Sequence, residues 1–326
     1  MRRIVVVAAL ALLVVACGGA EPPAARPGAG PPGEQGELSG SIVIDGSSTV
    51  GPLTEALAEE FRTQAPDVIV NISQSGTGGG FERFCGTGDT QISNASRPIS
   101  EEEAALCEQN GIEYTELRVG TDALTMVTSP QTEFVDCLTT DELVKIWGPG
   151  GAKAWNEVNP KFPAQKLQIF APGADSGTYD FFNETVLEPA EIEQPRQDYS
   201  ASEDDNIIAQ GVIGTPGSWG FFGFAYFQEN KGELKDLAYD AGDGCVKPSA
   251  ATAQDGSYKL TRPLFIYVRN DALAQPHVTG FTTYYLDHVN DVIGDVGYIP
   301  EPDRALASAK DALGREISRQ QPGESS

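Results

Sequence analysis

Residues 42–61, IVIDGSSTVGPLTEALAEEF, contain the pattern that decides the fold. The apolar residues Ile42 to Ile44 predict a short buried strand, which ends in a run of glycine, serine and threonine. Apolar residues then recur at helical spacing up to Phe61, and Pro52 suits the first turn of a helix. The stretch therefore predicts a strand, a hydroxyl-rich turn and a helix in direct succession.

The same succession occurs twice more along the chain. Val68–Ile72 is a predicted strand before the second cluster, and Leu167–Phe170 is one before the third. The three clusters are Ser47-Ser48-Thr49, Ser75-Gly76-Thr77-Gly78 and Ser176-Gly177-Thr178. Val119–Val127 and Pro263–Val268 are further predicted strands, and Ser100 predicts the capped start of an acidic helix that ends at Asn110-Gly111. Because strands alternate with helices, we expect an α/β fold with central sheets.

Each cluster has the chemistry of an anion site. The first turn of a helix has unpaired N–H groups and a partial positive charge, glycine lets an anion approach, and hydroxyls add donors. One cluster alone is more often an ordinary helix cap. Three clusters that all follow strands favour a shared oxyanion site, because ligands of open α/β sheets bind at the carboxyl ends of strands. None ends in the Gly-Lys-Ser/Thr of a nucleotide-binding loop, so nucleotide hydrolysis has no support.

The composition argues against several other functions. The chain has 326 residues, which is enough for about two domains, and 40% of them are hydrophobic. Its 47 acidic and 22 basic residues give a net charge of −25, which disfavours nucleic acid and polybasic membrane contact. The only histidines, His277 and His288, lie in no catalytic or metal-binding motif. We therefore expect no metal and no cofactor.

The first 36 residues predict export. Residues 1–16 have the form of a signal peptide, because the apolar run that follows the first arginines is shorter than the roughly 20 residues of a membrane span. Cys17 stands where this run stops, as in a bacterial lipobox, and would carry a lipid anchor. Ordinary signal cleavage is the alternative. Residues 17–36, rich in proline and glycine, predict a flexible linker, and 319–326 a tail.

Five motifs together resemble those of the phosphate-binding proteins of ABC transporters. They are Gly46-Ser47-Ser48-Thr49-Val50, Ser75-Gly76-Thr77-Gly78-Gly79-Gly80-Phe81, Asn94-Ala95-Ser96-Arg97-Pro98, Asp175-Ser176-Gly177-Thr178 and Arg262-Pro263-Leu264-Phe265. The resemblance spans about residues 38–310. It implies a two-lobed periplasmic-binding-protein fold of type II, which closes around one phosphate at a hinge crossed twice by the chain. Lobe one would comprise 37–120 and 264–318, and lobe two 121–263.

The resemblance also implies a function and a set of ligands. The function is that of an extracytoplasmic receptor that delivers inorganic phosphate to an ABC permease. Such a receptor is a monomer and not an enzyme, and it contacts the membrane through its lipid anchor alone. The phosphate ligands carried over by position are Ser48, Thr49 and the Val50 amide, then Ser75 with the Gly76 and Thr77 amides, then Ser176, Gly177 and Thr178.

The chain departs from well-known family members at two places. Those members have an arginine just before the lobe-two Ser-Gly-Thr, where this chain has Ala171-Pro172-Gly173-Ala174. They also have an aspartate at the position where this chain has Arg97. We infer that Arg97 supplies the cation as a bidentate clamp. The alternative is a structural Arg97, in which case another cation, Arg262 or Arg83, has to be sought. The acceptor of the phosphate proton is then unassigned. Asp175 is one candidate, although it could equally cap the helix.

The cysteines agree with export. Four remain besides Cys17, and an even number in an exported chain predicts disulfides with three possible pairings, against four free thiols. Given the two lobes that the resemblance implies, we expect one disulfide in each lobe, Cys85–Cys107 and Cys137–Cys245.

Three other functions stay open at this point. The same fold could bind sulfate or molybdate, or it could serve adhesion or signalling without a ligand. A secreted hydrolase would need a base for a nucleophile such as Ser176, and neither a suitable histidine nor a Gly-x-Ser-x-Gly elbow is present. The negative charge does not oppose anion binding, because it is screened beyond roughly 8–10 Å at physiological salt.

Overall fold

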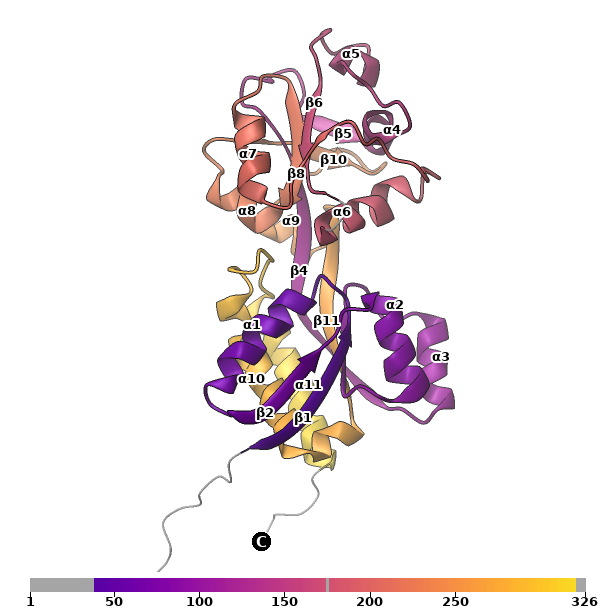
Figure 1. Cartoon of the computed structure of the whole chain (residues 1–326), viewed down its shortest axis with the longest axis vertical. Coiled ribbons are helices and arrows are strands. Elements are labelled where there is room, and N and C mark those ends of the chain that lie inside the picture. The colour runs from indigo at the N-terminus through magenta and orange to yellow at the C-terminus, as the bar shows by residue number, and fades with distance from the viewer. Residues whose placement is uncertain (1–37, 174–175, 321–326) are drawn as a thin grey trace, which may run out of the picture. The chain divides into compact units, whose positions relative to one another are not determined.

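The computed structural model describes residues 38–173 and 176–320 (Figure 1). The predicted signal peptide, Cys17, the predicted linker and Asp175 lie outside the described residues, as does the predicted tail beyond Gln320.

In the described part of the chain, one mixed sheet of nine strands carries the fold. Its order is β2-β1-β3-β11-β4-β8-β6-β7, and β9 pairs with β4 off this path. These strands are β1 (Ser39–Gly46), β2 (Asp67–Ile72), β3 (Ile92–Ala95), β4 (Tyr114–Thr128), β6 (Gln168–Ala171), β7 (Ser200–Ala201), β8 (Ser218–Gly223), β9 (Lys235–Asp236) and β11 (Thr261–Arg269). A separate parallel pair is β5 (Cys137–Thr139) and β10 (Ala238–Asp240).

Two strands join the halves of the sheet. The first part of β4 pairs with β11 through Ala123, and Leu124–Thr128 pairs with β8 (Figure 1). We call the half with β1, β2 and β3 lobe one, and the half with β5 to β10 lobe two. β4 and β11 continue without a break through positions 120 and 263. The lobe boundaries expected there stay a prediction.

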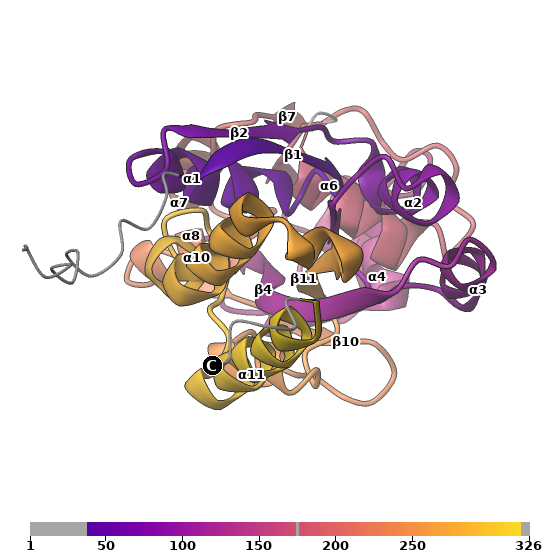
Figure 2. The ribbon, with the colours of Figure 1, turned by 90° about the horizontal axis from the view of Figure 1, so that it is seen from below.

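Helices cover both lobes. In lobe one, α1 (Gly51–Arg62) and α10 (Pro276–Val292) pack side by side, and α11 (Asp303–Gln320) packs against β4 (Figure 2). The remaining helices are α2 (Gly76–Phe81) and α3 (Glu101–Gln109) in lobe one, and α4 (Thr140–Trp147), α5 (Trp155–Val158), α6 (Gly177–Phe182), α7 (Asp205–Ile213), α8 (Phe224–Glu229) and α9 (Ala250–Gln254) in lobe two. A π-helical segment extends α2 through Thr87, and another extends α6 through Leu187.

Each lobe has its own hydrophobic core. In lobe one, Leu53, Leu57 and Phe61 of α1 pack with Phe281 and Tyr285 of α10. The lobe-two core is more aromatic, and its fully buried members include Trp147, Trp155, Trp219, Phe182 and Phe221. Burial of large apolar side chains is the main stabilising contribution to folding. Each lobe therefore has a core that can support the site residues of that lobe.

The structure confirms the main local predictions. Pro52 lies in the first turn of α1, and Ser100 forms a capping box with Glu103 at the start of α3. Both expected disulfides are present, Cys85–Cys107 and Cys137–Cys245. The two-lobed α/β fold is also as expected.

Two features of the C-terminal region differ from the expectation or go beyond it. α11 continues two positions past 318, because the buried Glu316 accepts hydrogen bonds from Arg319 and Gln320. Neither α10 nor α11 was predicted from the sequence. Among the described residues, no helix has both the length and the apolarity that a membrane span requires.

Candidate anion-binding site

The candidate site begins at the carboxyl ends of β1 and β3, which are parallel neighbours. The amide of Ser47 donates to the carbonyl of Asn94 over 2.9 Å, which holds the two strand ends together. Gly46 has a φ of 136°, and a Cβ there would lie 2.1 Å from the Asn94 oxygen. Only glycine therefore allows the first cluster to leave β1 in this direction.

Asp45 joins the first cluster to the second. Its carboxylate, 1% exposed, accepts hydrogen bonds from the amides of Gly46 (2.7 Å) and Ser75 (3.0 Å) and from Nη1 of Arg83 (2.6 Å). Burial alone would raise the pKa of Asp45, but the bonds from Arg83 and the two amides outweigh it, and the pKa is lowered. The ionised Asp45 thus fixes the turn before α2 relative to the end of β1.

Two pockets lie between the lobes and share part of their lining, and together we call them the cleft. Their volumes are about 520 and 420 Å³. Both are lined by Ser48 and Thr49 of lobe one, by Asp180 of lobe two and by Arg262 of β11. The other lining residues are Ser47, Gly76, Thr77, Gly78, Ser96, Arg97, Glu184 and Glu188 in the first pocket, and Pro52, Gln74, Asp122, Gly177, Thr178 and Tyr298 in the second.

The cleft brings together most of the predicted phosphate ligands. They are Ser48, Thr49, Gly76, Thr77, Arg97, Gly177 and Thr178. The other three do not line either pocket. Val50 is buried in the lobe-one core, the Ser75 amide is bound to Asp45, and the Ser176 hydroxyl accepts the Thr178 amide as a helix cap. The roles of all ten as ligands stay predictions.

Arg97 has a carboxylate partner within its own lobe. Its Nη1 and Nη2 atoms each donate to one carboxylate oxygen of Glu103 over 2.8 Å, and Nη1 also donates to the Pro98 carbonyl. Burial would raise the pKa of Glu103, but the bonds from Arg97 and Ser100 lower it, so the carboxylate is ionised at neutral pH. Arg97, whose side chain is 45% exposed, thus lines the cleft with much of its charge compensated.

Arg262 is the buried cation of the cleft. Its guanidinium lies 4.5 Å from the centre of the Phe181 ring, and Nε donates to the buried Asp122 over 2.9 Å. Nη2 donates to the carbonyl of Gly177 over 2.9 Å, so Arg262 also holds the first turn of α6. From the sequence, Arg262 was named only as part of a motif and, beside Arg83, as a substitute cation in case Arg97 is structural. The available signal was its position directly before a strong predicted strand at the expected crossing between lobes.

Three carboxylates of lobe two also line the cleft. Asp180, Glu184 and Glu188 follow one another at intervals of four residues, in α6, in its π-helical extension and directly after it, and all three line the first pocket. Burial raises the pKa of Asp180 and of Glu184, and the charge of Arg262 opposes this rise in both. Sequence reasoning missed these acids, although their regular spacing could have indicated a shared face.

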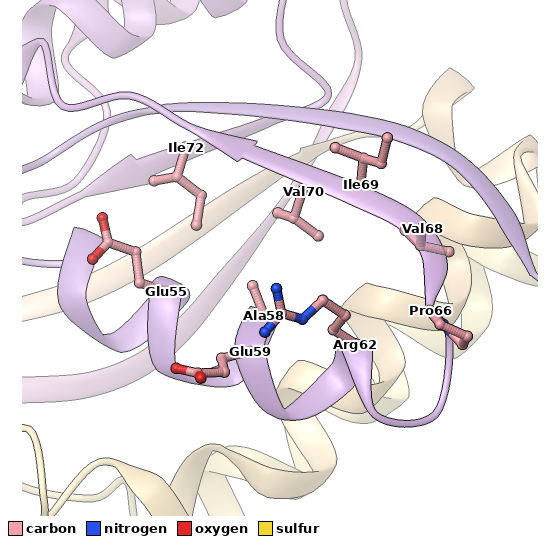
Figure 3. A pocket seen from close by; sticks show the side chains of 9 residues that line it. All are labelled: Glu55, Ala58, Glu59, Arg62, Pro66, Val68, Ile69, Val70 and Ile72. Carbon is pink, nitrogen blue, oxygen red and sulfur yellow. The ribbon is translucent and has the colours of Figure 1, made fainter.

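A further groove lies between α1 and β2, away from the clusters (Figure 3). Its volume is about 530 Å³, and Val68, Val70 and Ile72 give it an apolar side, with charged side chains of α1 beside them. It contains no hydroxyl cluster, so the anion chemistry belongs to the cleft. No group of three potential metal ligands occurs in the described ranges 38–173 and 176–320.

The comparisons with known proteins agree with this geometry. The model of the PBP superfamily domain matches residues 31–288. The chain belongs to this superfamily. It is 45% identical over 273 residues to Protein SphX of Synechococcus elongatus, covering 82% of this chain and 80% of that protein. It is 36% identical over 304 residues to the phosphate-binding protein PstS of Staphylococcus saprophyticus, covering 93% and 90%.

A solved structure extends the agreement to three dimensions. The chain matches the crystal structure of a possible phosphate-binding protein from Planctomyces limnophilus with a TM-score of 0.81 and 39% identity. The match covers 86% of this chain and 99% of the other. The resemblance carried by the five motifs is thereby confirmed at the level of the family, as is the two-lobed fold.

Proposed function

We propose that this protein captures inorganic phosphate in the cleft and delivers it to an ABC permease. The observation that carries the proposal is the meeting, in one cleft, of hydroxyls and helix-start amides from both lobes with the buried Arg262. The relatives that are named phosphate-binding proteins support phosphate over sulfate or molybdate as the ligand.

The proposed binding mode divides the work between the lobes. Ser48, Thr49 and Thr77 would donate from lobe one, and Thr178 from lobe two, while arginine supplies the full positive charge that a phosphate dianion needs when water leaves. Val50, Ser75 and Ser176 lie just outside the pocket linings. We propose that they complete the set when the lobes close around the hinge strands β4 and β11.

We further propose that the protein acts as a receptor without catalysis. His277 lies beside Gly40 and His288 beside Tyr284, and neither lines the cleft. A seryl nucleophile in the cleft therefore has no histidine base there, which removes the main support for a hydrolase.

Calorimetric titration of the purified protein with phosphate, sulfate and arsenate tests the proposal. We expect saturable binding of phosphate at one site and much weaker binding of sulfate. The matched control is Arg62→Met, which removes an arginine from the groove of Figure 3 and should leave the phosphate affinity unchanged. Heat release with sulfate but not with phosphate would assign the cleft to another oxyanion, and no heat with any of them would refute an anion receptor.

We also infer that the mature protein is an extracytoplasmic monomer, anchored through lipid on Cys17 and the linker 17–36. The support is the cysteine at the end of the apolar run and the two disulfides, which are typical of exported proteins. Mass spectrometry of the mature protein should find a diacylglyceryl group on Cys17. A mature N-terminus at any other residue would contradict the anchor.

A further inference from the structure

The three nitrogens of the Arg262 guanidinium have different surroundings. Nε is bound to Asp122, and Nη2 is bound to the carbonyl of Gly177. Nη1 has a looser partner, the Glu184 carboxylate, whose oxygen lies 3.9 Å away. Nη1 is thus the nitrogen of Arg262 that can donate to a bound oxyanion without breaking a close hydrogen bond.

We propose that Glu184 competes with the bound anion for Nη1 of Arg262 and so determines the affinity of the cleft. This inference rests on the proposed function, because it assigns a role to a residue within the same site. An anion that binds Nη1 of Arg262 must displace the Glu184 carboxylate, unless that carboxylate is already protonated. Glu184 is therefore a residue that weakens binding and makes release easier.

The position of Glu184 suits a displaceable competitor. Its side chain is 61% exposed, whereas Asp122, the other carboxylate beside Arg262, has a side chain that is 6% exposed. A buried carboxylate with a close partner would lose much interaction energy if it left that partner. An exposed carboxylate whose partner is 3.9 Å away loses little interaction energy when it turns toward water. Asp122 therefore fixes Arg262, and Glu184 can leave it.

The charges around Glu184 predict how the competition depends on pH. Its own helical segment presents Asp180 and Glu188, and the elements opposite present Arg262 and Arg97. Although much of its side chain is exposed, the partial burial of Glu184 against the cleft raises its pKa, the two neighbouring acids add to the rise, and the two arginines oppose it. As the pH falls toward this raised pKa, Glu184 takes up a proton and stops competing, so its penalty on anion binding fades.

The test compares Glu184→Gln with the unmodified protein by calorimetric titration of phosphate from mildly acidic to mildly alkaline pH. We expect the variant to bind phosphate about 3- to 10-fold more tightly at alkaline pH, the size of a partly exposed charge interaction. The ratio of the two affinities should approach one as the pH falls. Using the ratio at each pH cancels the ionisation of phosphate itself.

Glu229→Gln is the control, because it removes an exposed acid of lobe two, on α8, that lines neither pocket of the cleft. It should change the affinity less than twofold. An NMR titration of the Glu184 carboxyl gives a second measurement, and its pKa should rise further in Arg262→Met because the opposing positive charge is gone.

The outcomes separate the two proposals. If the unmodified protein binds phosphate and Glu184→Gln binds it no more tightly, the competition is refuted while the receptor function stands. An unchanged Glu184 pKa in Arg262→Met would likewise refute the pairing. If neither protein binds phosphate at any pH, the proposed function fails, and the competition fails with it.

Discussion

The two walls of the cleft are built in different ways. The lobe-one wall consists of the turns after β1, β2 and β3, and hydrogen bonds between these turns hold its polar groups. Asp45 binds the Ser75 turn, and the Thr77 hydroxyl accepts the Ser96 amide. The lobe-two wall is one helical segment with three carboxylates, and Arg262 of β11 is the cation that meets it most closely.

This difference suggests a division of roles. A wall whose donors are fixed before the ligand arrives loses little entropy on binding, which favours affinity. A wall that carries negative charge beside an anion site lowers affinity and responds to pH. We infer that lobe one provides the preformed part of the phosphate site and lobe two the adjustable part, with Arg262 at the junction. Substitutions at four positions test this comparison.

The largest effect is expected from Arg262→Met, which keeps an apolar side chain near Phe181 but removes the charge. Loss of a buried, charge-assisted contact in an interface costs about 2–5 kcal/mol, so phosphate affinity should fall roughly 30-fold to several-thousand-fold. Calorimetry measures this loss. Because Asp122 would be left buried without its partner, circular dichroism must first show that the variant is folded at the pH used. Unchanged affinity in a folded variant would remove Arg262 from the site.

A smaller effect, on stability, is expected from Arg83→Met in lobe one. It leaves the buried Asp45 with amide partners alone and should lower the free energy of unfolding by about 1–3 kcal/mol. The 40% exposure of Arg83 places the value toward the lower end. Urea unfolding at neutral pH measures the difference.

The pH dependence of this difference provides its own control. The folded pKa of Asp45 lies below its ordinary value of 3.8, so the stabilisation is fully present above that value and is lost as the pH falls through the folded pKa. The gap between the two proteins should therefore close in strong acid. A gap that persists there would show that Arg83 stabilises by packing.

The lobe-one wall could be predicted from the sequence because its signals are local. A strand, a Ser/Thr/Gly cluster and a helix follow one another within about twenty residues, as at 42–61, and Gly46 and Pro52 mark the turns. The same local rules predicted the capping box of Ser100 and the strand of Pro263–Val268.

The lobe-two wall could not be predicted in the same way. Arg262 enters the cleft because β11 pairs with β4 in a register that places it opposite Asp122, a contact between residues far apart in the sequence. The role of Glu184 depends in turn on where Arg262 lies. The partner of Arg97 was not predicted either, because no sequence pattern marks which of the acids in the first turn of α3 turns back to Arg97.

The smallest effect is expected from Arg97→Ala, and it decides how far the lobe-one wall is preformed. Arg97 was predicted from the sequence to clamp phosphate, but a bidentate clamp would have to leave Glu103, whose two oxygens it already binds. If Arg97 stays bound to Glu103, it acts on phosphate only by charge attraction, without a direct hydrogen bond. Removing Arg97 should then weaken phosphate binding about 3- to 10-fold, as is typical of partly exposed charges. Arg97→Lys should then recover most of the affinity, since charge suffices.

Glu103→Gln sharpens the same question, because glutamine can still accept the Ser100 amide and keep the helix cap while it loses the negative charge. With Arg97 no longer held by a carboxylate, this variant should bind phosphate slightly more tightly than the unmodified protein. A fall in affinity on Arg97→Ala as large as that for Arg262→Met, with no recovery by lysine, would show instead that Arg97 leaves Glu103 for the ligand. The lobe-one wall would then rearrange on binding, and the contrast between a preformed and an adjustable wall would have to be abandoned.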